Sequence, residues 1–153
     1  MKMYKKHIFS LITLTILAGC SGPWSSSKTT PQATESKTIV NNPHITNINS
    51  TNDFKKLINT KNSIVIKFSA AWCGACKSIQ PLYEEIAQEF SKQYTFAVVD
   101  IDKTKDLGNE YKITGIPVFM FFKNGEETDQ NKRIIGSSVS KSEFITTMQA
   151  ALQ

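Results

Sequence analysis

The chain has 153 residues, of which 40% are hydrophobic and 20% charged, and its formal net charge is +5. Three cysteines are too few for a disulfide-stapled scaffold, two histidines leave little for a metal cluster, and no apolar run reaches the roughly 18 to 20 residues of a membrane-spanning helix. The charge excess lies near the N-terminus, because residues 48–153 contain 13 basic and 12 acidic side chains. This near-neutral balance gives no support to nucleic-acid binding.

Residues 1–19 have the pattern of a secretory signal peptide. A basic leader of three lysines precedes a mostly apolar, uncharged stretch over residues 8–19. The stretch ends in Leu17-Ala18-Gly19-Cys20, which resembles the signal box of bacterial lipoproteins. That resemblance implies cleavage before Cys20 and attachment of diacylglycerol and palmitate there, which would anchor the protein in the membrane. An ordinary cleaved signal and an uncleaved short anchor are the alternatives.

The residues that follow Cys20 predict a tether. Ser21, rather than an aspartate, is by resemblance to Gram-negative sorting rules compatible with transfer to the outer membrane; with a single membrane, the anchor would hold the protein on the extracellular face. Residues 21–47 are rich in Ser, Thr, Asn and Gln, so they cannot bury enough apolar surface to offset their ordering entropy. We therefore expect a signal peptide over 1–19, a lipidated cysteine and flexible linker over 20–47, and a domain over 48–153.

Hydrophobic periodicity then predicts alternating helices and strands. In chain order we expect a first edge strand over 45–49, a short helix capped by Thr51 or Asn52, a strand over 63–68, a helix that runs to about residue 92 with a kink at Pro81, a strand over 95–100, a short helix over 105–111, a strand over 118–122, a hairpin turn at Asn124-Gly125, a partner strand to about residue 135, and a final helix capped by Ser140 with Glu143. The near-continuous apolar strands favour a sheet covered on both faces. The expected fold class is therefore α/β, a three-layer sandwich.

Two cysteines separated by two residues stand where a buried strand gives way to a helix. Cys73 would lie at the helix N-terminus, where unpaired amides and the helix dipole stabilise a thiolate. Cys76 would lie one turn along, near enough to close a disulfide. In this arrangement Cys73 attacks and Cys76 resolves. Half of a zinc site is the alternative, but the sequence has no second cysteine pair and no histidine beyond His44 to complete it.

The surrounding segments resemble thioredoxin in order and in place. They are Phe68-Ser69-Ala70-Ala71-Trp72-Cys73-Gly74-Ala75-Cys76-Lys77, Pro81, Gly115-Ile116-Pro117, Phe122-Lys123-Asn124-Gly125 and Gly136, and the resemblance covers residues 48–153. It implies a thioredoxin fold with a mixed central sheet and a thiol–disulfide oxidoreductase that needs no cofactor and acts on protein disulfides. It further implies a cis peptide bond before Pro117, against the redox-active disulfide, and a substrate groove lined by Trp72, Ile116 and Gly136.

Two departures from thioredoxin leave the direction of the reaction open. Lys67 stands where thioredoxin has a buried aspartate, and a cation there would favour a thiolate and a more oxidising potential. The alternative is that Lys67 extends to solvent and does little. Ala75, after Gly74, replaces the usual proline of the dipeptide that tunes the couple. Ile116 before Pro117 is the thioredoxin-like choice and favours a reductase.

The leading hypothesis is a lipid-anchored, monomeric oxidoreductase of the cell envelope that reduces protein disulfides. Because envelope compartments are oxidising, it would need electrons from a membrane thiol donor. A disulfide oxidant or isomerase is the second hypothesis. A redox-silent binding module, in which the groove holds a partner protein, is the third.

Overall fold

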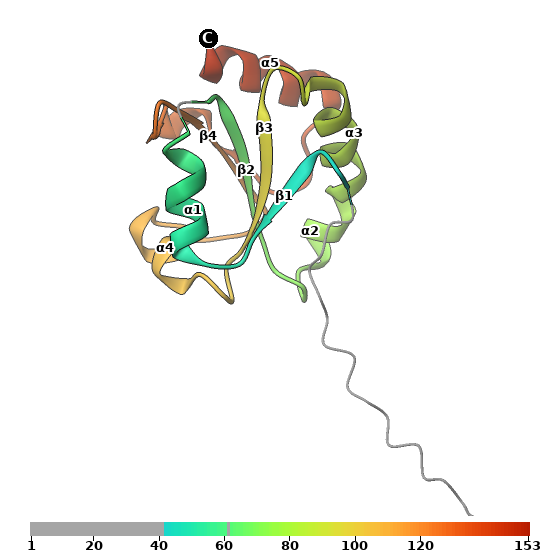
Figure 1. Ribbon diagram of the computed structural model, residues 1–153. Coiled ribbons are helices and arrows are strands. Elements are labelled where there is room, and N and C mark those ends of the chain that lie inside the picture. Colours follow the sequence, from blue (N-terminus) through green and yellow to red (C-terminus); the bar gives the residue numbers. More distant parts are fainter. Residues whose placement is uncertain (1–41, 61) are drawn as a thin grey trace, which may run out of the picture. The chain divides into compact units, whose positions relative to one another are not determined.

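The computed structural model describes residues 42–60 and 62–153, so the expected signal peptide, Cys20 and most of the expected linker lie outside the described residues. The described residues form a six-stranded sheet flanked by helices (Figure 1). The strands are β1 (Ile45–Ile48), β2 (Ile64–Ser69), β3 (Thr95–Asp100), β4 (Val118–Lys123), β5 (Glu126–Glu127) and β6 (Ile134–Ile135). The helices are α1 (Thr51–Ile58), α2 (Gly74–Ser78), α3 (Gln80–Phe90), α4 (Lys105–Glu110) and α5 (Lys141–Leu152), with a 3-10 turn η1 (Gln130–Lys132).

The sheet is mixed, with the order β1-β3-β2-β4-β5, and β6 also pairs with β4. β1 and β2 both run parallel to β3, whereas β4 runs antiparallel to β2. Parallel neighbours need a crossover between them, which the intervening helices supply. β2 is therefore flanked by β3 and β4, and all six of its residues are buried. This central strand leads directly into the cysteine pair.

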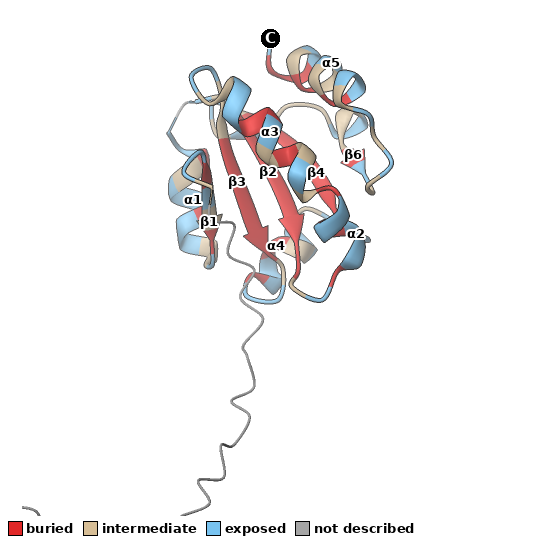
Figure 2. Ribbon diagram, turned by 90° about the vertical axis from the view of Figure 1, so that its right-hand side faces the viewer, coloured by how far each residue is buried: buried red, intermediate tan, exposed pale blue. Residues whose placement is uncertain are grey.

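Two hydrophobic clusters, one on each face of the sheet, confirm the three-layer sandwich. Along β2, Val65 packs in the cluster that contains residues of α3 and α5, while Ile66 packs in the cluster that contains residues of α1 and α4. Successive strand residues point to opposite faces, so an uninterrupted apolar strand serves both cores. Figure 1 shows α1 and α4 on one side of the sheet and α3 on the other, and Figure 2 shows the buried strands between them.

The sheet begins earlier along the chain than the predicted domain boundary. Ile45 is buried and pairs with Phe96 of β3, so residues 45–47 belong to the sheet and not to the linker expected over 20–47. β1 confirms the edge strand expected over 45–49, in which two polar residues, Thr46 and Asn47, lie between the buried ends. No helix within residues 42–60 and 62–153 is long and apolar enough to cross a membrane.

The helix expected to continue from the cysteine pair to about residue 92 is instead two helices, α2 and α3. They meet at Ile79, and Pro81 occupies the first turn of α3. Proline has no backbone N–H, and the first turn is where that group has no intrahelical acceptor, so a new helix start replaces the expected kink. α3 ends at Phe90.

The ends of the first and last helices differ in how well the sequence predicts them. Ser50, and neither Thr51 nor Asn52, caps α1, because its Oγ accepts the N–H of Asp53 at 3.1 Å. Ser140 caps α5 as predicted, and its Oγ accepts the N–H of Glu143 at 3.2 Å.

Asn124-Gly125 forms the predicted turn, with positive φ angles of 56° and 93° as a type I′ hairpin requires. The partner strand expected to run to residue 135 is broken into β5 and β6. Glu127 pairs with Phe122 and Ile135 pairs with Val118. The two pairs are therefore eight positions apart on the returning chain but only four positions apart on β4. The excess residues leave the sheet and form η1.

Candidate active site

The cysteine pair lies at the end of β2, where the chain turns into α2. Cys73 is the N-cap of α2, and the backbone N–H of Cys76 donates to Cys73 Sγ at 3.0 Å. The two cysteines form a disulfide with Cα atoms 5.3 Å apart. Cys73 is 5% exposed and Cys76 2%. The first sulfur therefore receives an N–H bond that would stabilise its thiolate in the reduced protein, as the spacing of the pair predicted.

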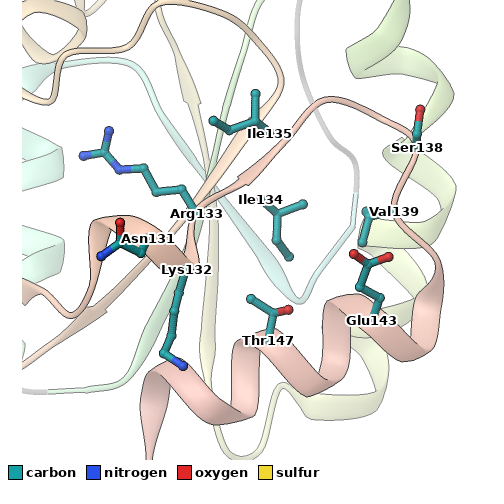
Figure 3. Close-up of a pocket in the computed structure, with 9 residues that line it drawn as sticks. All are labelled: Asn131, Lys132, Arg133, Ile134, Ile135, Ser138, Val139, Glu143 and Thr147. Atoms are coloured by element: carbon teal, nitrogen blue, oxygen red, sulfur yellow. The ribbon is translucent and has the colours of Figure 1, made fainter.

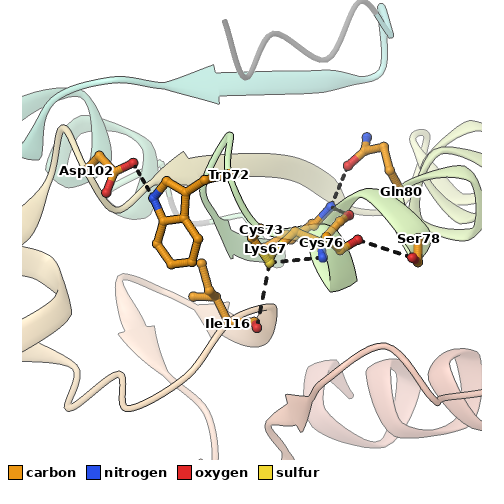
Figure 4. The surroundings of a disulfide bond; sticks show 9 residues. Lys67, Trp72, Cys73, Cys76, Ser78, Gln80, Asp102 and Ile116 are labelled. Atoms are coloured by element: carbon orange, nitrogen blue, oxygen red, sulfur yellow. Dashed lines mark hydrogen bonds between the residues drawn. A yellow bond between two sulfur atoms is a disulfide. The ribbon is translucent and has the colours of Figure 1, made fainter. Parts of the chain in front are cut away.

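The loop before β4 lies against this disulfide (Figure 4). The carbonyl oxygen of Ile116 is 3.8 Å from Cys73 Sγ, and the Ile116–Pro117 peptide bond is cis. Pairing of β6 with β4 brings Gly136 to the same loop, where its N–H donates to the carbonyl oxygen of Pro117 at 2.8 Å. Gly136 has φ +87°, a backbone conformation that favours glycine. The structure thus places Ile116 against Cys73 and Gly136 against Pro117 in the same loop.

Trp72 precedes the pair and is 67% exposed. Its indole Nε1–H donates to Asp102 Oδ2 at 2.9 Å, a bond between residues 30 positions apart in the chain. Asp102 is itself positioned by Asp100, whose carboxylate accepts the backbone N–H of Asp102 at 3.0 Å at the end of β3. Asp102 was not among the predicted site residues, because no local pattern links the end of β3 to Trp72.

Lys67 is 1% exposed, so the interpretation that it extends to solvent is wrong. It lies on central β2, opposite Val98 of β3 and Phe119 of β4. Its Nζ donates to the carbonyl oxygen of Cys76 at 2.9 Å and to Gln80 Oε1 at 2.5 Å.

The electrostatics of Lys67 follow from this burial. Desolvation lowers the pKa of Lys67 from 10.5 to about 8, and the negative charge of Glu84 opposes the shift. The ammonium form therefore predominates at neutral pH, next to the disulfide. Gln80 was also not among the predicted site residues. It lies four residues after Cys76, and this helical spacing was the one feature of the sequence that could have placed it near the pair.

Gly74 and Ala75, between the cysteines, are both exposed. A Cβ added at Gly74 would meet nothing within 4 Å. Among the described residues there is no group of three or more His, Cys, Asp or Glu side chains that could hold a metal ion.

A hollow of about 380 Å³ lies between β6 and α5 (Figure 3). Lys132, Arg133 and Glu143 contribute to its lining, but neither cysteine does. The hollow is therefore separate from the redox pair.

Comparison with known proteins agrees with this geometry. A family model described as Thioredoxin matches residues 45–150. Thioredoxin from Neurospora crassa is 33% identical over 111 residues, which cover 71% of this chain and 84% of that protein. Thioredoxin from Mycoplasmoides gallisepticum is 39% identical over 87 residues, which cover 57% of this chain and 83% of that protein. The crystal structure of thioredoxin from Malassezia sympodialis has a TM-score of 0.62 at 30% identity, and covers 71% of this chain and 94% of that one.

The matched segment contains the whole sheet and the cysteine pair at disulfide distance. A pair of this kind in this fold exchanges its disulfide with those of other proteins, so the protein is a thiol–disulfide oxidoreductase. The chain therefore belongs to the thioredoxin family.

Proposed function

We propose that this protein reduces disulfide bonds of protein substrates in the cell envelope, where a lipid on Cys20 anchors it. The observation that identifies Cys73 as the attacking residue is the difference between the surroundings of the two cysteines. Cys73 faces the Ile116–Pro117 loop and accepts the N–H of Cys76, whereas Cys76 is the more buried residue and contacts Lys67 through its carbonyl.

The reaction takes two exchange steps. The Cys73 thiolate attacks one sulfur of the substrate disulfide, forms a mixed disulfide and releases the first substrate thiolate. The Cys76 thiol loses its proton and attacks Cys73 Sγ, which releases the second substrate thiolate. Two electrons pass from the pair to the substrate, and the Cys73–Cys76 disulfide is the product on the enzyme. The proximity of the two sulfurs makes the second step intramolecular and therefore fast.

The surface around Cys73 suits a protein substrate. Trp72 and Ile135 are the two large hydrophobic side chains exposed in the described part of the chain, at 67% and 74%. Trp72 adjoins Cys73, and Ile135 adjoins Gly136, which bonds to Pro117. An extended substrate segment across Cys73 would bury apolar area on both. The sequence analysis included Trp72 in this groove but missed Ile135.

The location rests on the N-terminal pattern of the sequence. A basic leader, an apolar stretch and Leu17-Ala18-Gly19-Cys20 occur in the order of a lipoprotein signal. More than one acyl chain makes such an anchor stable. In an oxidising compartment the pair must be reduced again after each turnover, so we assign a membrane dithiol protein as the electron donor.

A disulfide oxidant or isomerase is the second candidate, and one observation favours it. Lys67 is a buried cation next to Cys76, where it would stabilise a thiolate and hence the reduced pair. A pair that is stable when reduced is a stronger oxidant.

Trapping tests the function directly. Membranes from cells that express Cys76→Ala should contain mixed disulfides between Cys73 and substrate proteins, which a non-reducing gel displays and a reductant removes. Cys73→Ser is the matched control and should trap none. If Cys76→Ala traps no more than Cys73→Ser, the disulfide-exchange proposal fails.

The direction of the redox reaction and the location of the protein need separate measurements. If the protein is a reductase, cells that lack its gene should accumulate substrates with oxidised cysteines. If it is an oxidant, those cells should contain substrates with free thiols. Thiol alkylation of the trapped substrates decides between the two directions. Cys20→Ala should lose palmitate labelling and leave the membrane fraction. Retention of the label on Cys20→Ala would refute the lipid anchor without touching the exchange chemistry.

A further inference from the structure

The redox pair has a polar neighbour that the two exchange steps do not use. Lys67 is enclosed in the core on the α3 face of the sheet, and its Nζ bonds to Cys76 O and Gln80 Oε1. Both acceptors are neutral. Removing an ammonium from water costs free energy that hydrogen bonds to two neutral acceptors offset only in part, so this group does not stabilise the fold. This makes a role in the chemistry of the adjacent cysteine worth testing.

A hydrogen-bonded chain connects Lys67 with the protein surface. Gln80 accepts from Lys67 with its Oε1, and its Nε2–H donates to Glu84 Oε1 at 2.8 Å. Gln80 and Glu84 are both on α3 and half-buried. The Gln80 amide thus orients the Lys67 ammonium, and its hydrogen bond to the Glu84 carboxylate strengthens its bond to the lysine.

The other groups that face Lys67 carry no competing charge. Its neighbours on β3 and β4 are Val98 and Phe119. The ring of Tyr83 lies 5.9 Å from Nζ, and its hydroxyl lies within hydrogen-bond distance of two strand carbonyls, to one of which its single hydrogen is donated. Burial raises the pKa of Tyr83, so this phenol stays neutral. Glu84, through Gln80, is the acidic side chain that acts on the lysine.

We propose that Lys67 is a positioning residue which holds a positive charge against Cys76, that Gln80 keeps it in place, and that this charge stabilises the Cys76 thiolate of the reduced enzyme. The inference rests on the proposed exchange chemistry and bears on its direction, because a pair that is stabilised when reduced is a stronger oxidant. It assigns roles to Lys67 and Gln80 in setting the equilibrium of the pair, in addition to their structural contacts.

The redox step can be written with glutathione as the reductant. Two glutathione thiols are oxidised to glutathione disulfide, two electrons enter the Cys73–Cys76 bond, and that bond breaks. The two protons that glutathione releases go to the new thiolates or to solvent. The uncharged disulfide gains nothing from Lys67, whereas a Cys76 thiolate gains a favourable charge interaction. The cation therefore shifts the equilibrium toward the reduced pair.

Two measurements on the full chain test this, in detergent and with Cys20→Ser so that the pair holds the only thiols. The first is the pH midpoint of Cys76 ionisation, followed by alkylation rate in a Cys73→Ser background. The second is the equilibrium constant with glutathione at pH 7. Lys67→Met should raise the midpoint and shift the equilibrium at least threefold toward the disulfide.

Matched variants separate the proposal from a general change of charge or fold. Lys77→Met removes the same charge from an exposed position in α2 and should change neither quantity. Gln80→Leu should move both in the direction of Lys67→Met but less far, and it decides the matter if Lys67→Met does not fold. An unchanged midpoint in Gln80→Leu and in any folded Lys67→Met overturns the proposal. Mixed-disulfide trapping by Cys76→Ala would still succeed in that case, so the proposed function would stand.

Discussion

The buried charge of Lys67 predicts a specific dependence of stability on pH. In the folded protein, burial lowers the pKa of Lys67 from 10.5 to about 8. Below pH 8 the folded and the unfolded chain both hold the proton, and the folded chain bears the full unfavourable energy of the buried ammonium. Between pH 8 and 10.5 the folded chain has lost the proton and the unfolded chain has kept it. Because the unfolded chain then binds more protons, the free energy of unfolding rises with pH.

The size of the effect follows from the same two values. A change in pKa from 10.5 to about 8 corresponds to about 3 kcal/mol, at 1.36 kcal/mol for each pKa unit. Lys67→Met fills a similar volume and does not titrate. The free energy of unfolding of wild type should therefore rise relative to that of Lys67→Met by about 3 kcal/mol between pH 7 and 10.5.

Urea unfolding of the disulfide form, followed by circular dichroism, measures this difference at half-unit steps of pH. Taking the difference between the two proteins cancels the titration of every group that they share. Lys77→Met serves as the control, and its difference from wild type should stay flat because Lys77 is exposed. A flat difference for Lys67→Met as well would refute the reasoning, since Lys67 would then titrate alike in the folded and the unfolded chain.

Three further predictions concern other parts of the protein. Arg133→Met should lower the free energy of unfolding by about 3 kcal/mol, because it leaves a buried carboxylate without its partner. The carboxylate is that of Glu127, whose side chain is 10% exposed and accepts Arg133 Nη2–H at 2.7 Å. A urea midpoint equal to that of wild type would count against this prediction. Gly136→Ala should cost about 1 kcal/mol, measured in the same way, because φ is +87° and the added Cβ would meet nothing within 4 Å, so backbone strain is its sole cost. Trp72→Ala should leave stability within about 0.5 kcal/mol and lower kcat/KM for a protein disulfide about tenfold, with a small aromatic disulfide as the control substrate; equal losses on both substrates would exclude a role in binding the protein chain.

Local signals predicted those parts of the protein that depend on neighbours in the chain. Ser140 caps α5 and Asn124-Gly125 forms the turn, because a cap and a hairpin turn are made by residues two or three positions apart. The thiolate-stabilising contact of Cys73 is equally local, since its donor is the backbone N–H of Cys76. A near-continuous apolar run likewise predicts that a strand is buried on both faces, which β2 confirms.

Short-range spacing was thus enough to predict the fold class, the order of the main elements and the cysteine pair. The tertiary structure decided what surrounds that pair. Trp72 bonds to Asp102, 30 residues away, and Gly136 reaches Pro117 through the pairing of β6 with β4. Lys67 is buried because β2 is a central strand, and strand order is not encoded by any local pattern. Contacts of this kind depend on which distant segments pack together, and only the assembled sheet specifies them.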